Sequence, residues 1–284
     1  MSALSNEMNG LWLQNPPAQL PLLDTLVLMS LSPTDIVDIL RIAATPNCRR
    51  YTISIDSWHL DSMVFTTVAE RIQQLLETRI SSCRVLEIHL NDIEIRIVCR
   101  TDRYPYSDFN LTLGWGGSDE RVFDWLSNML LVRRPLLSPI PIELYLQYSR
   151  VDGSPPSPSS LFQLSGVRSL MISGYQGWAI HLVEALSTPR DSENDNALWM
   201  WPNLREVTVI AFNGSSLKAL LHMVETRAEA ALHWQGTEVI AMLERLDVRG
   251  LVFTSEELEA IRAITRDVVV VTPINPIFLG FHSL

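Results

Sequence analysis

The chain has 284 residues, of which 47% are hydrophobic and 19% charged, a composition that supplies a globular core and excludes the disordered class. Its 22 basic and 32 acidic residues give a formal net charge of −10, which argues against a nucleic-acid partner because phosphate binding requires basic clusters. No stretch reaches the ~20 apolar residues of a membrane span, and no signal peptide is recognisable. We therefore expect a cytoplasmic or nuclear protein that binds neither membrane nor nucleic acid.

A short phrase recurs along the chain: an apolar residue, two spacers, an apolar residue, one spacer and a third apolar residue. Most copies precede a segment with helical periodicity, so each unit is predicted to be a strand followed by a helix. This pattern is typical of leucine-rich repeats, whose units bury their apolar faces by stacking on one another. The copies begin at Leu23, Cys48, Cys83, Val167, Leu204 and Leu243, with a weaker copy at Pro141.

The repeats predict an α/β fold, a degenerate leucine-rich-repeat solenoid with a curved sheet and an inserted β-hairpin. We expect a flexible N-terminal segment at residues 1–19, a single domain at 20–272 and a C-terminal tail at 273–284. The six main copies start 25, 35, 84, 37 and 39 residues apart, whereas leucine-rich repeats usually take roughly 20–29 residues. Most units must therefore contain insertions.

Helix signals support the first two units. After the first strand, Ser32 offers a capping hydroxyl, Pro33 suits the first helical position, and Asp35 falls in the first turn, where the helix dipole favours an acid. The second unit combines a strand at 51–55 with a helix at 62–79.

The interval of 84 residues contains the predicted insertion. Its alternating runs at 93–99 and 109–115 flank a polar loop, which indicates an antiparallel hairpin. A helix with its buried stripe at 122–130 and a strand at 142–146 follow. The Ser- and Pro-rich stretch 151–160 is predicted to be an exposed loop.

The last repeat has equally clear signals. A polar loop at 191–196 lies within an earlier unit, and a strand at 246–248 opens the final one. Thr254 and Glu257 have the spacing of a capping box at the start of the next helix. A closing strand is predicted at 268–271.

Three segments give the chain a resemblance to a known family: Trp201–Val209, Leu243–Gly250 and Phe253–Ala263. They are similar to the C-terminal leucine-rich-repeat region of the F-box-like proteins of mushroom-forming fungi, over residues 20–271. The resemblance implies a region that recognises ubiquitin-ligase substrates, while an F-box would bind a Skp-type adaptor and cullin. Because Leu20-Pro21 stands too close to the repeats to open an F-box, we expect this sequence to lack that element.

Strand alternation predicts the binding residues. If the apolar residues of each phrase point into the core, the residues between them face the open side of the sheet, which in a solenoid forms a concave binding surface. The candidate partner-binding residues are Thr52, Ser54, Glu87, His89, Arg96, Glu143, Tyr145, Gln147, Met171, Glu206, Arg245, Asp247 and Arg249.

The sequence contains no G-x-S-x-G elbow, no phosphate-binding G-x-x-x-x-G-K-[ST] loop and no H-E-x-x-H zinc motif. We therefore expect no enzymatic activity, no catalytic residue, no cofactor and no metal. A remote alternative is a metal-dependent hydrolase built from two His-x-x-Glu pairs on predicted helices, His181 with Glu184 and His222 with Glu225. The three cysteines, Cys48, Cys83 and Cys99, lack metal or redox spacing and are predicted to be buried.

The sequence thus favours a non-catalytic protein–protein interaction domain that resembles the substrate-recognition region of an F-box ubiquitin-ligase subunit, with an unknown protein as its target. A second interpretation is a stand-alone scaffold or decoy that has no connection to ubiquitination. An F-box encoded upstream would distinguish the two.

Overall fold

The computed structural model describes fifteen stretches of the chain, and all structural statements below concern these residues. They are 18–20, 22–29, 31–44, 48, 50–55, 62–80, 83–91, 94–100, 107–114, 140–148, 166–174, 176–189, 199–210, 214–233 and 239–271. The predicted helix stripe at 122–130 and the predicted loops at 151–160 and 191–196 lie outside them. So does the tail predicted at 273–284.

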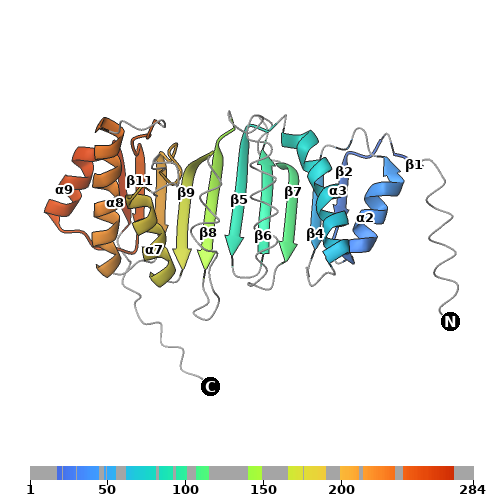
Figure 1. Cartoon of the computed structure of the whole chain (residues 1–284), viewed down its shortest axis with the longest axis horizontal. Coiled ribbons are helices and arrows are strands. Elements are labelled where there is room, and N and C mark those ends of the chain that lie inside the picture. The colour runs from blue at the N-terminus through green and yellow to red at the C-terminus, as the bar shows by residue number, and fades with distance from the viewer. Residues whose placement is uncertain are drawn as a thin grey trace, which may run out of the picture. The chain divides into compact units, whose positions relative to one another are not determined.

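The chain divides into two compact units, and neither is a continuous piece of sequence. Unit 1 comprises residues 1–86 and 93–116, and unit 2 comprises residues 87–92 and 117–284. Both units combine β-strands with α-helices (Figure 1), which confirms the predicted α/β class.

Unit 1 contains a mixed sheet with the strand order β6-β7-β4-β2. Strands β2, β4 and β7 run parallel, whereas β6 and β7 pair antiparallel as the predicted hairpin, which is confirmed. Strands β1 and β3 form a separate two-stranded parallel sheet. The elements are β1 (Ala18–Gln19), β2 (Thr25–Leu28), α2 (Pro33–Ile42), β3 (Ala43–Ala44), β4 (Arg50–Ile55), α3 (Ser62–Ile80), β6 (Glu94–Arg100) and β7 (Ser107–Gly114).

Unit 2 has the strand order β12-β11-β10-β9-β8-β5. Strands β8 to β12 are all parallel, and helices connect successive strands from β9 onward. In Figure 1, α7 and α8 lie in front of the strands, and α9 lies beside α8 at the left end. The elements are β5 (Val85–Asn91, residues 87–91 in this unit), β8 (Ile142–Tyr148), β9 (Val167–Gly174), α7 (Gln176–Ser187), β10 (Glu206–Ile210), α8 (Gly214–His233), β11 (Arg245–Arg249), α9 (Ser255–Ile264) and β12 (Asp267–Val271).

The recurring apolar phrase forms the core of each sheet. In unit 2 the register aligns Leu144, Leu170, Val207 and Leu246 in one row across four strands, and each is at most 1% exposed. The next inward row, two residues along, consists of Leu146, Ile172, Val209 and Val248. In unit 1 the corresponding row is Ile97, Leu111, Ile53 and Leu28. Burial of these rows confirms the inward direction predicted for the phrase, and the three cysteines are also buried as predicted.

The two helix starts predicted from cap residues are confirmed. Helix α2 begins at Pro33, and the Ser32 hydroxyl accepts a hydrogen bond of 3.1 Å from the Asp35 amide. At α9 the Thr254 hydroxyl accepts from the Glu257 amide at 3.2 Å, while the Glu257 carboxylate accepts from the Thr254 amide at 2.8 Å. Both ends of this capping box are therefore formed.

A buried arginine joins helix α8 to the turn before β10. Arg227 is fully buried and donates to the carbonyl oxygens of Met200 at 3.1 Å and Trp201 at 2.9 Å. Its guanidinium lies over the Trp199 ring, 5.8 Å from the centroid. Burial lowers the pKa of Arg227 to about 10. Trp201 has a left-handed φ of 49°, and the turn that contains it presents two successive carbonyl oxygens to the Arg227 side chain.

We predict that Arg227→Met lowers the free energy of unfolding by about 2–3 kcal/mol, because the two carbonyls lose a charged donor in a buried site. Urea unfolding followed by circular dichroism measures this change. Arg262→Met, on the exposed surface of α9, is the matched control and should stay within about 0.5 kcal/mol of the parent. Equal stability of the two variants would contradict the role of Arg227.

The capping box gives a second prediction. Thr254→Ala should cost about 1 kcal/mol, since the Glu257 amide loses its acceptor, and hydrogen exchange of the α9 amides should accelerate. Thr254→Ser retains the hydroxyl and should exchange like the parent protein. Unchanged exchange in the alanine variant would show that α9 is held by packing alone.

Candidate binding face

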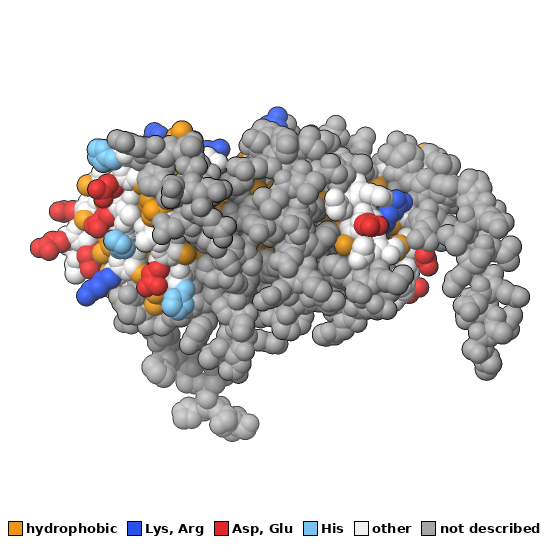
Figure 2. Space-filling view, viewed as in Figure 1, with side chains coloured by type: hydrophobic (Ala, Val, Ile, Leu, Met, Phe, Trp, Pro, Cys, Tyr) orange, Lys and Arg blue, Asp and Glu red, His pale blue; other side chains and the backbone are white. Residues whose placement is uncertain are grey.

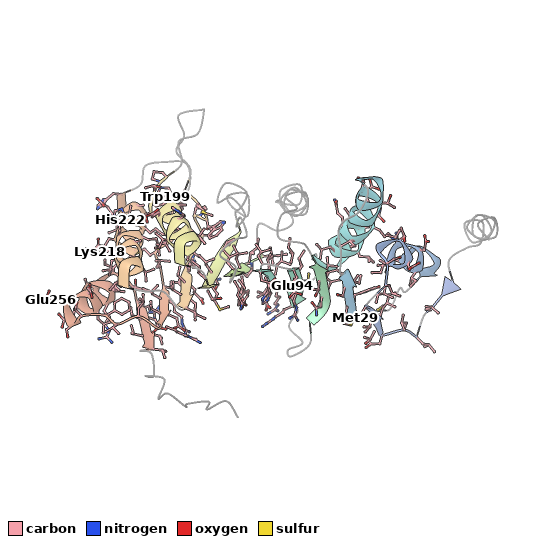
Figure 3. All side chains as sticks on the ribbon, turned by 90° about the horizontal axis from the view of Figure 1, so that it is seen from below. Met29, Glu94, Trp199, Lys218, His222 and Glu256 are labelled. Atoms are coloured by element: carbon pink, nitrogen blue, oxygen red, sulfur yellow. The ribbon has the colours of Figure 1, made fainter. Side chains whose placement is uncertain are left out.

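One face of the unit 2 sheet carries polar side chains in ordered rows. We call the outward residues of β5 and β8 to β12 the open face of unit 2. Figure 3, seen from below, shows α7 and α8 on one side of these strands, α9 at the left end, and side chains projecting from the other side of the strands. The first row is Glu143, Ser169, Glu206, Arg245 and Asp267; the second is Tyr145, Met171, Thr208, Asp247 and Val269; the third is Gln147, Ser173, Ile210, Arg249 and Val271.

Two rings and two carboxylates meet where β5 and β8 carry their outward residues. The His89 and Tyr145 rings stack with centroids 4.2 Å apart and an interplanar angle of 4°. The Tyr145 hydroxyl donates to Glu143 Oε2 at 2.8 Å, and His89 Nε2 lies 3.2 Å from Glu87 Oε2. The stack and the two hydrogen bonds therefore restrain all four side chains, so this part of the face is organised by contacts within the protein.

Glu87 and Asp247 occupy outward positions but are themselves buried, with 3% residue exposure each. Each is contacted by the residue two positions further along its own strand, His89 and Arg249 respectively. Those neighbours are more exposed, at 33% and 52% of the side chain. The face therefore presents His89 and Arg249 at these points, and the two carboxylates lie beneath them.

Both arginines of the open face of unit 2 are ion-paired. Arg249 Nη2 donates to Asp247 Oδ2 at 2.8 Å and Arg249 Nε to Asp247 Oδ1 at 3.2 Å. This hydrogen bonding, together with the charge of Asp247, raises the pKa of Arg249. Arg245 Nε lies 3.9 Å from Asp267 Oδ2 on the adjacent strand.

Glu143 and Glu206 differ from the other carboxylates of this face. Across the described stretches, neither has an ion pair with a basic side chain. The register places them in the same row on β8 and β10, with Ser169 of β9 between them. The face therefore has an excess of negative charge on either side of β9.

Unit 1 has its own outward face, which contains the other three candidate residues. Arg96, Thr112 and Ser54 share one row, and Thr52 lies in the next row beside Asn110. The Arg96 Nε donates to Asn110 Oδ1 at 3.0 Å, which links the hairpin strands across the sheet. Thr52, Ser54 and Arg96 are thus brought together within unit 1, and the remaining ten candidates lie on the open face of unit 2.

The sequence did not indicate Asp267, Val269, Ser173 or Ile210 as members of the face. Asp267 and Val269 belong to β12, whose run of valines predicts a strand that closes the sheet and gives no sign of side chains on the open face. Period-two alternation along β9 and β10 is the signal that would have included Ser173 and Ile210. The ring stack of His89 on Tyr145 had no sequence signal, because the pairing of strands 56 residues apart cannot be deduced from alternation.

The described residues include no group of three or more His, Cys, Asp or Glu side chains arranged to hold a metal ion. His181 Nδ1 lies 3.4 Å from Glu184 Oε2, with both side chains well exposed. His222 instead has Thr226 as its neighbour, with 3.5 Å between His222 Nδ1 and Thr226 Oγ1.

In the part of the chain that the structure describes, no helix has the length and apolar character needed to cross a membrane.

Comparison with known proteins found no matching family model, no matching curated protein and no matching solved structure.

We predict an energetic coupling between Tyr145 and Glu143. Tyr145→Phe keeps the stacked ring but removes the hydroxyl, and should cost about 0.5–1.5 kcal/mol. In a Glu143→Ala background the same change should cost much less, because the acceptor is already absent. A double-mutant cycle by urea unfolding measures the coupling, and additivity within about 0.3 kcal/mol would contradict it.

Proposed function

We propose that the chain is a non-catalytic protein–protein interaction domain, built as a degenerate leucine-rich-repeat solenoid, and that it binds a protein target on the open face of unit 2. The observation behind this proposal is the set of in-register rows of polar and aromatic side chains on a sheet face whose opposite side is covered by helices. Parallel strands with helical connections are also the arrangement that stacked repeats require.

The physical argument is preorganisation. Adjacent strands lie about 4.8 Å apart, so a row of outward residues offers contacts at fixed intervals without ordering a loop. Binding to such a surface loses little conformational entropy on the side of the receptor. Tyr145, Met171 and Arg249 are of the residue types enriched at protein interfaces, and a flat row of side chains suits a protein segment better than a small molecule, which requires a concave pocket.

The resemblance to F-box-like proteins supports a more specific form of the proposal, in which the bound protein is a ubiquitin-ligase substrate. On this reading the open face selects the substrate, and an F-box in the same protein or complex recruits the Skp-type adaptor. The alternative is a recognition scaffold that acts without a ligase.

The test is quantitative affinity capture with the tagged full chain from cells that express it. The variant Glu143→Ala/Tyr145→Ala/Arg245→Ala removes one acid, one ring and one base from the open face. We expect it to lose at least fivefold of the target proteins that the open face binds, because a few central side chains contribute most of the binding energy of an interface. The matched control Glu225→Ala/His222→Ala/Lys218→Ala removes the same chemistry from exposed positions on α8 and should retain the captured proteins.

Circular dichroism and the urea midpoint should show that both triple variants are folded. If the folded face variant retains every protein that the control retains, the proposal is wrong. Capture of a Skp-type adaptor and cullin by the parent and by both variants would support the ligase form, whereas target capture without them would favour the scaffold.

A further inference from the structure

The charge on the open face of unit 2 is unbalanced. The face has five acidic side chains and two basic ones, a net charge of −3 with His89 neutral. Arg249 forms an ion pair with Asp247 and Arg245 with Asp267. The Glu87 carboxylate lies 3.2 Å from His89 Nε2. The excess therefore resides at Glu143 and Glu206, the two carboxylates that flank β9.

Glu143 and Glu206 lie in the same row of the sheet, so one cation can interact with both carboxylates. Two strand spacings separate β8 from β10, about 10 Å, and Ser169 between them is small. A guanidinium or ammonium group above Ser169 would lie within a few ångströms of both acids. Like charges held this close favour a cation between them.

The surroundings favour the side chain of a protein over a bare ion. The Tyr145 hydroxyl orients the Glu143 carboxylate, and the His89 stack holds the Tyr145 ring. Met171, in the adjacent row of β9, offers an apolar contact. Long basic side chains bury their methylene stems on such residues while the charged end remains beside acids.

Resting on the proposed function, we infer that the open face of unit 2 binds a basic segment of a protein partner, with an Arg or Lys side chain placed over β9 between Glu143 and Glu206. The segment itself is recognised by charge complementarity along the rows, which sets the rate and specificity of association more than its strength. The negative region ends at β11, where the positive charges of Arg245 and Arg249 repel a cation.

The helix side of the same unit is also acidic (Figure 2), with exposed Glu225, Glu229, Glu256 and Glu259 on α8 and α9. A basic peptide could therefore be attracted to the protein without using the open face. The experiment must separate the two surfaces at equal net charge.

The probe is an eight-residue peptide of alternating Arg and Ser with a fluorescent label, and its anisotropy is measured with the full chain at low salt. We expect it to bind at least tenfold more tightly than Gln/Ser and Glu/Ser peptides of the same length. Glu143→Gln/Glu206→Gln should weaken binding about tenfold, as expected for the loss of two partly exposed ion pairs. Glu225→Gln/Glu259→Gln, with the same net charge, should stay within twofold of the parent.

Tyr145→Phe supplies a further readout, because it leaves every charge in place. Loss of the hydroxyl that orients Glu143 should weaken the Arg/Ser peptide about threefold and leave the Gln/Ser peptide unchanged. Equal weakening by the two glutamine double variants, equal binding of the three peptides, or no binding of the Arg/Ser peptide at 1 mM would each overturn the inference.

These outcomes are distinguishable from failure of the proposed function. If the peptide inference fails while the triple face variant still loses its cellular partners, the face binds protein of another chemistry. If the face variant also keeps its partners, both conclusions fall.

Discussion

The in-register parallel pairing of β8 to β12 is the constraint on which the rest of unit 2 depends. Because side chains alternate along a strand, one register decides at once which residues enter the core and which are displayed. A slip of one residue at β10 would bring Glu206 and Thr208 into the layer occupied by Leu170 and Leu246. Burial of charge without a partner makes such a slip very unfavourable. The buried apolar rows therefore also fix the positions of the polar rows on the open face.

Arg227 anchors helix α8 through backbone carbonyl oxygens. Two of its guanidinium nitrogens donate to backbone carbonyls and the group lies over an indole ring, and no acidic side chain among the described residues forms an ion pair with it. Such an arrangement ties the orientation of α8 to the backbone of the turn before β10. The Trp199 and Trp201 side chains are buried beside this contact, which places large apolar area around the charge and explains the lowered pKa of Arg227.

Local chemistry made much of the fold predictable. Ser32 and Thr254 predict helix starts because each hydroxyl accepts a hydrogen bond from the backbone amide three residues later. The recurring apolar phrase predicts the strands because alternation is a local property of the sequence. Contacts between distant segments were not accessible in this way. Arg227 looks like any exposed arginine in a polar stretch of helix, and its carbonyl partners are 26 and 27 residues away. For the same reason the face could be predicted as a set of outward residues, but the stack of His89 on Tyr145 and the burial of Glu87 could not.

The interleaved division of the chain has a practical consequence for dissecting this protein. Residues 87–92 belong to unit 2 although residues on both sides of them belong to unit 1, so a single cut cannot release either unit intact. A fragment starting at residue 117 would keep Tyr145 and Glu143 but would lack Glu87 and His89. Its Tyr145 ring would lose the His89 imidazole on which it stacks, so the fragment would lack this organised part of the face even if its five remaining strands folded correctly.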